Sequence, residues 1–154
     1  MKFKEIPLFR AVHRIYPDIE RRRGDAWLRD TNKRRELYRE VINAFLNFGY
    51  EDGFPWSLEA VLVAWATYGK QSKLVPGTEV TKIGLICDLY EKHDQKRCFY
   101  EGRHSVPCDD EATVDRIRPA SKGGEYTVQN CVLACSKHNT ARSDKRISDF
   151  VNEE

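Results

Sequence analysis

The chain has 154 residues, 40% of them hydrophobic, which suits one folded domain or a small domain with a helical addition. Its formal net charge of +2 argues against strong nonspecific binding of nucleic acid over the whole surface. No apolar run approaches the ~18 residues of a membrane span. Because residues 1–5 lack the apolar core of a secretory signal, we expect a cytoplasmic protein without a membrane partner.

Apolar side chains at three- and four-residue steps predict four helices, over residues 5–16, 25–48, 57–69 and 80–93. Pro17 should end the first helix, because proline cannot continue a helical hydrogen-bond ladder. Gly49 and Gly69 should end the second and third helices. Ser57 is the expected N-cap of the third helix, since its hydroxyl can accept a free backbone N–H.

The positive charge is concentrated near the N-terminus. Lys and Arg outnumber Asp and Glu over residues 1–40, whereas acidic residues are in excess over residues 41–95. Five basic side chains fall on the expected second helix: Arg29, Lys33, Arg34, Arg35 and Arg39. They either contact phosphate groups or solvate the helix surface. Residues 1–95 are therefore expected to form a helical region that is a candidate for DNA binding or dimerisation.

Five cysteines occur in the chain, and most of them lie between residues 98 and 135. In a reducing compartment such a cluster indicates metal ligation rather than a set of disulfides. Cys87 falls on the apolar face of the expected fourth helix, and Cys131 opens an apolar run. Both thiols are therefore expected in a hydrophobic core.

The run of residues 114–139 carries the most informative pattern. A short strand-like segment ends on the pair Asp115-Arg116, and a Gly-Gly loop and a second apolar segment follow. Cys135, two further residues and His138 then stand at the start of a helix, directly before Asn139. This order resembles the HNH endonucleases, whose ββα-metal motif reads Asp-His-Ile-x-Pro-x-Ser-x-Gly-Gly and then Asn-x-Val-x-Ala-Cys-x-x-Cys-Asn.

The resemblance covers roughly residues 96 to 150 and implies the fold. We expect an α+β protein in which the helical region of residues 1–95 precedes a zinc-stapled ββα-metal (HNH) module at residues 96–154. A structural zinc needs four nitrogen or sulfur ligands, and two half-sites of the family supply them. Glu101 stands where the family has a cysteine, so Cys108 is the expected replacement, with His104 and Glu101 as alternatives. The expected zinc ligands are Cys98, Cys108, Cys135 and His138.

The resemblance also implies a second, catalytic metal. Asp115 and Asn139 would hold one divalent ion, and their oxygen atoms favour Mg²⁺ or Mn²⁺. Asn130 would clamp the loop that carries the end of the first strand. Arg116 stands where the family has its general-base histidine. An arginine cannot accept a proton near neutral pH, but its guanidinium can bind a phosphate group through two parallel hydrogen bonds.

Three interpretations of Arg116 follow. In the first, another group is the base, and the candidates are His104, Tyr126, metal-bound water and, if it does not bind zinc, His138. Alternatively, the module is inert and only binds nucleic acid or a protein partner. Finally, Arg116 is an introduced change that silences a histidine enzyme.

We predict a divalent-metal-dependent endonuclease that hydrolyses phosphodiester bonds in DNA, with Asp115, Arg116, Asn130 and Asn139 at its catalytic site. The alternative is a catalytically inactive zinc module that binds nucleic acid or a protein. Contacts to DNA should go mostly to the backbone. The residues expected to make them are Lys122, Lys137, Arg142, Lys145 and Arg146. A homodimer is compatible with this function, since cutting both strands needs two active sites or two events.

Overall fold

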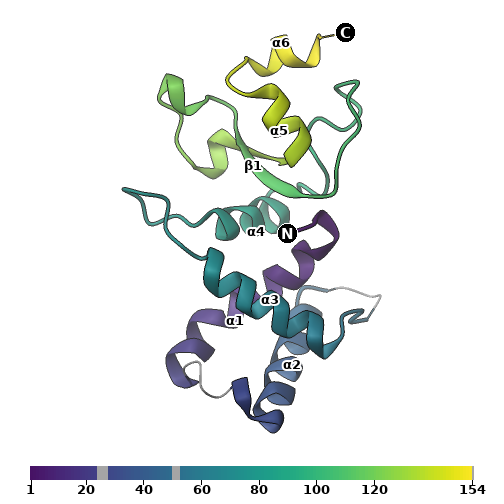
Figure 1. The fold of residues 1–154 in the computed structure, drawn as a ribbon, viewed down its shortest axis with the longest axis vertical. Coiled ribbons are helices and arrows are strands. Elements are labelled where there is room, and N and C mark those ends of the chain that lie inside the picture. The colour runs from purple at the N-terminus through teal and green to yellow at the C-terminus, as the bar shows by residue number, and fades with distance from the viewer. Residues whose placement is uncertain (24–27, 50–52, 154) are drawn as a thin grey trace. The chain divides into compact units, whose positions relative to one another are not determined.

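The computed structural model describes residues 1–23, 28–49 and 53–153 (Figure 1). Contacts within the chain separate it into two units, one of residues 7–72 and one of residues 1–6 together with residues 73–154. The first unit is helical, and the second contains a two-stranded sheet with helices. The expected α+β class is confirmed. None of the described helices combines the length and the apolar character that a membrane crossing requires.

The first helix, α1, spans Ile6–Arg23 and contains Pro17 in its interior. The prediction that Pro17 ends this helix is wrong. A proline inside a helix costs about 3 kcal/mol, because it removes one hydrogen bond and crowds the preceding turn. Ile19, which follows the proline, is only 1% exposed. Its burial offsets much of that cost, since a fully buried isoleucine contributes about 1.5–3 kcal/mol.

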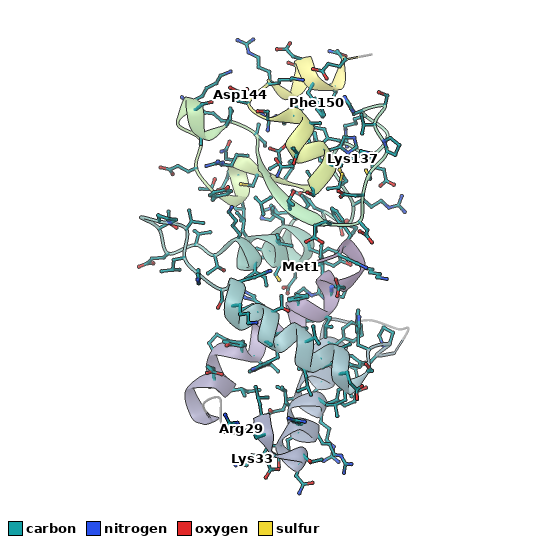
Figure 2. All side chains as sticks on the ribbon, in the orientation of Figure 1. Met1, Arg29, Lys33, Lys137, Asp144 and Phe150 are labelled. Carbon is teal, nitrogen blue, oxygen red and sulfur yellow. The ribbon has the colours of Figure 1, made fainter. Side chains whose placement is uncertain are left out.

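The second helix, α2, spans Thr31–Leu46 and begins later than the predicted Asp25, which lies outside the described residues. Asp30 sets the start, because its carboxylate accepts the N–H groups of Asn32 and Lys33 at 2.9 and 3.1 Å. Gly49 has a φ of +79° after the helix end, as a helix-terminating glycine should. Arg29, just before α2, and Lys33, in its first turn, are exposed (Figure 2), whereas Arg34 is half-buried and donates to the carbonyl of Leu28.

Helix α3 spans Leu58–Gln71, and the hydroxyl of Ser57 caps it by accepting the N–H of Ala60 at 3.1 Å. The prediction that Gly69 ends α3 is wrong, because the helix continues to Gln71. Gly69 instead allows a close contact with α1. A Cβ atom at this position would lie 2.6 Å from the hydroxyl oxygen of Tyr16. Tyr16 also packs on the rings of Trp65 and Tyr68, each at a centroid distance of 4.6 Å.

The second unit contains a two-stranded antiparallel sheet, β1 (Ala112–Arg116) and β2 (Cys131–Cys135). Three helices accompany it: α4 (Lys82–Lys92), α5 (Ser136–Arg142) and α6 (Ile147–Val151). Short 3-10 turns complete the elements, at Phe3–Glu5, Ala120–Lys122 and Val128–Asn130. In the register of the sheet Asp115 lies opposite Val132. Helix α5 lies beside β1, which brings the end of the first strand near the final helices (Figure 1).

Helix α4 shares one hydrophobic core with the sheet. Leu85, Ile86 and Leu89 of α4 pack in the same cluster as Val114 and Leu133. Contacts therefore place α4, which lies before residue 95, in the same unit as the sheet, and the functional division of the chain at residue 95 stays a prediction. A second cluster joins Cys98 and Tyr100 to Phe150 of α6 and encloses the end of β2. As expected, Cys87 and Cys131 are both buried.

Candidate metal centre and active site

Four ligand atoms meet at the junction of β2 and α5. Those of Cys98, Cys108, Cys135 and His138 all lie within 4.8 Å of one another. The Nδ1 atom of His138 is 3.6, 3.5 and 3.2 Å from the sulfur atoms of Cys98, Cys108 and Cys135. In a tetrahedral zinc site the corresponding distance is about 3.6 Å, from bond lengths of about 2.3 Å to sulfur and 2.0–2.1 Å to nitrogen. The cluster therefore has the donors and the dimensions of a zinc site.

The local sequence explains why two of the ligands, Cys135 and His138, come together at the start of α5. Cys135 ends β2 and is the N-cap of α5, and its sulfur accepts the N–H of His138 at 3.4 Å. The two alternatives for the fourth ligand, Glu101 and His104, are not members of this group of ligand atoms, although the ring of His104 lies 5.3 Å from that of His138. Glu101 is exposed, and His104 stacks on Phe150 at a centroid distance of 4.0 Å while its Nδ1 accepts a backbone N–H. The structure thus brings together the four predicted ligands.

Burial changes the titration of these ligands. It raises the pKa of Cys98, and it raises the pKa of Cys108 to about 12, with the neighbouring Cys98 as a second cause. Burial and the nearby His104 lower the pKa of His138. At neutral pH His138 is therefore a neutral donor, whereas the two thiols must each lose a proton to bind a cation.

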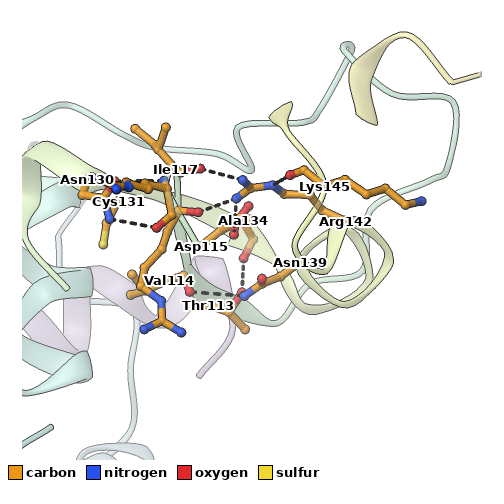
Figure 3. A network of polar contacts seen from close by, with 12 residues as sticks. Thr113, Val114, Asp115, Ile117, Asn130, Cys131, Ala134, Asn139, Arg142 and Lys145 are labelled. Carbon is orange, nitrogen blue, oxygen red and sulfur yellow. Dashed lines mark hydrogen bonds and ion pairs between the residues drawn. The ribbon is translucent and has the colours of Figure 1, made fainter. Parts of the chain in front are cut away.

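Asp115, at the end of β1, accepts hydrogen bonds from two side chains, and Figure 3 shows the one from Arg142. The hydroxyl of Tyr100 donates to its Oδ2 atom at 2.5 Å, and Arg142 Nη1 donates to its Oδ1 atom at 2.8 Å. The side chain of Asp115 is only 5% exposed. Burial raises the pKa of Asp115, while the bonds from Tyr100 and Arg142 lower it. Because each carboxylate oxygen accepts one of these bonds, a second lone pair on each stays available to a further ligand.

Arg142 is fully buried at the end of α5. Besides Asp115 it contacts three backbone carbonyls, those of Arg116, Ile117 and Lys145, the last two at 2.6 and 2.8 Å. The prediction that Arg142 contacts DNA is therefore wrong. Its side chain turns inward because the loop after β1 presents unpaired carbonyls that a guanidinium can satisfy.

Asn139 is oriented from the opposite side of the same region. Its Nδ2 atom donates to Thr113 Oγ1 at 3.0 Å and to the Val114 carbonyl at 3.2 Å. Thr113 in turn donates to the carbonyl of Ala134 at 2.8 Å. Among the described residues no group donates to Asn139 Oδ1, so this oxygen keeps its capacity to bind a ligand.

Asp115 and Asn139 share one small pocket of about 110 Å³. The side chains and backbone that line it belong to Val114, Asp115, Arg116, Pro119, Tyr126, Asn139 and Ser143. The residues that line the pocket thus include an aspartate, an asparagine and an arginine. Two oxygen donors of this kind suit a hard divalent cation such as Mg²⁺ or Mn²⁺.

The three side chains considered as general base are in different surroundings. Tyr126 lines the pocket, and the guanidinium of Arg116 lies 4.2 Å from its ring centroid. His138 belongs to the metal-ligand cluster, and His104 stacks beside that cluster on Phe150. Of the three, Tyr126 alone is at the pocket that holds Asp115.

Asn130 joins the two sides of the Gly-Gly loop. Its Oδ1 atom accepts the N–H of Arg118 at 2.9 Å, and its Nδ2 atom donates to the carbonyls of Arg118 and Glu125 at 3.1 and 2.9 Å. Gly124 passes close to this clamp, since a Cβ atom on it would lie 1.5 Å from the Arg118 carbonyl oxygen. Asn130 thus fixes the loop that borders the pocket.

The remaining basic side chains expected to contact DNA are all exposed: Lys122, Lys137, Lys145 and Arg146. Lys137 projects from α5 (Figure 2), and Lys145 pairs with Glu153 at 2.7 Å. Their contact with nucleic acid stays a prediction. Tyr100 and Thr113 are the polar residues of the site that the sequence did not single out. Neither belongs to a motif, so only the folded chain reveals their partners.

Comparison with known proteins agrees with this geometry. Residues 96–145 match the family model described as HNH endonuclease. No curated protein and no solved structure matches the chain. The matched range contains the four clustered metal ligands and the residues that line the small pocket. Residues 96–145 of this chain are therefore similar to the HNH endonuclease family.

Proposed function

We propose that the chain is a divalent-metal-dependent endonuclease that hydrolyses phosphodiester bonds in DNA. The HNH domain indicates a nuclease or a nucleic-acid-binding role. One observation supports the catalytic proposal above others: Asp115 and Asn139, from different elements, line a single pocket together with Arg116. A pocket that served only to bind phosphate would gain nothing from a carboxylate, which repels phosphate unless a cation lies between them.

In this proposal Asp115 and Asn139 hold Mg²⁺ or Mn²⁺ through their side-chain oxygens. The bound cation would stabilise the charge that develops on the leaving oxygen. Tyr100 and Arg142 keep the carboxylate of Asp115 oriented, and Thr113 does the same for the amide of Asn139. Such support limits the reorganisation that binding would otherwise require.

Arg116 stands at the position where the HNH family has its general base, but an arginine has a different chemical role there. Its guanidinium can donate two parallel hydrogen bonds to the phosphate and stabilise negative charge in the transition state. Stacking on Tyr126 restricts the conformations of this side chain. The proton of the attacking water must leave by another acceptor, and general-base help is worth about 10²–10⁴-fold in rate. We therefore expect slow cleavage by the chain as written.

A structural zinc is the second part of the proposal. The ligands would be Cys98, Cys108, Cys135 and His138, whose spacing fits a tetrahedral ion. Such an ion would join the loop before β1 to the start of α5. It would thereby stabilise a domain whose sheet has only two strands.

One observation favours the alternative, a module that binds nucleic acid without cutting it. Arg142 already pairs with Asp115, so the guanidinium of Arg116 leaves these three side chains with a net positive charge. Such a balance attracts phosphate and weakens the binding of a dication. The comparisons give no support to a homodimer, which stays a prediction.

Cleavage of supercoiled plasmid tests the proposal, with EDTA, Mg²⁺ and Mn²⁺ in parallel. The informative variant is Asn139→Ala, and Asn152→Ala is its matched control, because Asn152 is exposed and bonded only to Ser148 on α6 among the described residues. Metal-dependent cutting that Asn139→Ala abolishes and Asn152→Ala retains would support catalysis. Binding without cutting, unchanged by Asn139→Ala, would refute it.

An Arg116→His variant belongs in the same assay. If the histidine variant cuts and the unaltered chain does not, the metal site is functional but lacks its base. If neither variant cuts, the binding module becomes the better description. Asp115→Ala is less suitable as a first test, because it would leave the buried Arg142 unpaired.

A further inference from the structure

The ring of Tyr126 carries two cations from separate parts of the chain. The guanidinium carbon of Arg116 lies 4.2 Å from its centroid, and the ammonium nitrogen of Lys82 lies 5.1 Å from the same centroid. Lys82 is the first residue of α4 and precedes the range that matches the HNH family model. All three residues belong to the same unit of the structure.

Both cations lack an acidic partner among the described residues. Asp115, which neighbours Arg116 in β1, is already paired with Arg142. Since both cations lie close to one ring, they are separated by less than a Debye length of about 10 Å at 0.1 M salt, and their charges repel each other. An anion bound between them or beside them would relieve this repulsion.

Tyr126 gives the two cations a fixed support. Its side chain packs against the core cluster formed by α4 and the two strands. It also lines the pocket that contains Asp115 and Asn139. The two positive charges are therefore held at the edge of the candidate catalytic pocket. An anion that contacted both this pair of cations and the pocket would need several negatively charged groups in a row, as a nucleic-acid backbone has.

We infer that Lys82 and Arg116, supported by Tyr126, form a phosphate-binding pair for the DNA backbone next to the candidate catalytic pocket. Lys82 extends the DNA-contacting surface from the HNH domain onto α4. The inference depends on the nucleic-acid-binding part of the proposed function and not on catalysis. It holds equally for a slow nuclease and for an inert binding module.

The test measures binding of a short fluorescent DNA duplex to the full chain, without added Mg²⁺ or Mn²⁺, over a range of KCl concentrations. Each phosphate contact contributes about −0.9 to the slope of log K against log salt concentration. Lys82→Ala should weaken binding and make this slope less steep by about 0.9. Lys92→Ala is the matched control, because Lys92 lies on the same helix, is 66% exposed and pairs with Asp88 at 3.4 Å.

Two substitutions of Tyr126 complete the test. Tyr126→Leu should weaken binding more than Tyr126→Phe does, because the leucine removes the aromatic face that supports both cations and the phenylalanine keeps it. The inference is overturned if Lys82→Ala matches the unaltered chain, or if Lys82→Ala and Lys92→Ala reduce the slope equally. An unaltered chain that shows no salt-dependent binding would refute the nucleic-acid role itself, and a loss of plasmid cutting alone would not affect the inference.

Discussion

Arg142 and Asp115 form a buried ion pair in which Arg142 Nη1 lies 2.8 Å from Asp115 Oδ1. The arginine is fully buried and the aspartate is 5% exposed. The pair joins the end of α5 to the end of β1, and the other donors of Arg142 hold the loop that follows β1. The guanidinium of Arg142 therefore both stabilises the fold around β1 and orients Asp115 in the candidate catalytic site.

Arg142→Met should destabilise the domain strongly. The substitution leaves the carboxylate of Asp115 buried with Tyr100 as its remaining donor, and breaking a buried ion pair from one side typically costs about 3–5 kcal/mol. Urea unfolding measures the free-energy change. Arg146→Met is the control, since Arg146 is exposed and should change stability by about 0.5 kcal/mol or less. Equal effects of the two substitutions would show that the Arg142 pair contributes little.

Tyr100→Phe isolates the second bond to Asp115. It removes one hydroxyl and keeps the ring that packs on Phe150, at a centroid distance of 5.1 Å. A hydrogen bond to a charged group is worth about 1.5–3 kcal/mol, so a loss of this size is expected at neutral pH. The bond lowers the pKa of Asp115, which means that it favours the ionised carboxylate. The difference from the unaltered chain should therefore shrink as the pH falls and Asp115 becomes protonated.

The same variant tests how Asp115 is oriented for a cation. Loss of a group that orients a metal ligand typically lowers metal affinity or activity about 10–100-fold. Titration of Mn²⁺ into the DNA-free protein measures this affinity directly. Tyr38→Phe is the control, because it removes a comparable hydroxyl bond, to the carbonyl of Trp56 at 2.8 Å, in the other unit. Unchanged Mn²⁺ affinity in Tyr100→Phe would contradict an orienting role for Tyr100.

The sequence predicts best where residue chemistry is restrictive. Few kinds of side chain bind zinc, so Cys98, Cys108, Cys135 and His138 could be selected as candidate ligands before their positions in the fold were known. Helical periodicity likewise located helices α1 to α4, because each has one apolar face. Their ends were less predictable. Pro17 and Gly69 are tolerated inside helices because of Ile19 and Tyr16, which are tertiary partners.

The polar network could not be predicted in the same way. Tyr100 and Arg142 are 15 and 27 residues away from Asp115 in the chain, and nothing in their spacing indicates that they meet. An arginine near the end of a charged helix resembles a solvent-exposed residue. Its burial depends on carbonyl groups of a loop whose path is fixed only after the sheet forms. Exposure of single charged residues is therefore the weakest inference from sequence.

Gly124→Ala should damage the loop beside the pocket more than Gly123→Ala does. The new Cβ atom of the first variant would lie 1.5 Å from the Arg118 carbonyl oxygen and 3.0 Å from Asn130 Nδ2. Backbone must move to relieve this contact, so the loss should exceed about 3 kcal/mol. Gly123 has a φ of +79°, and a Cβ atom on it would meet only Arg118 Nη2 at 3.9 Å, an ordinary contact, so alanine there costs about 1–2 kcal/mol for the backbone conformation. Thermal unfolding of both variants decides the order, and the reverse order would contradict the close approach of Gly124 to Arg118.

Zinc binding by the cysteine cluster should depend steeply on pH. Burial raises the pKa of Cys98 and raises that of Cys108 to about 12, so both thiols are protonated at neutral pH before a cation binds. Because the pKa of His138 is lowered, its imidazole is already neutral and adds no proton to the exchange. Binding releases these two thiol protons, together with any proton on the third cysteine ligand, Cys135, so the apparent zinc affinity should fall by about 100-fold or more for each pH unit of acidification.

Competition with a coloured chelator at pH 6.5, 7.0 and 7.5 measures this dependence, and metal analysis should find about one zinc per chain. Cys108→Ala should lose the ion, since it removes one of four ligands. Cys131→Ala is the control, because Cys131 is buried in the core cluster of α4 and the sheet and is not among those ligands. Retention of tightly bound zinc by Cys108→Ala, or an affinity that does not change with pH, would mean that the cluster is not a four-ligand zinc site.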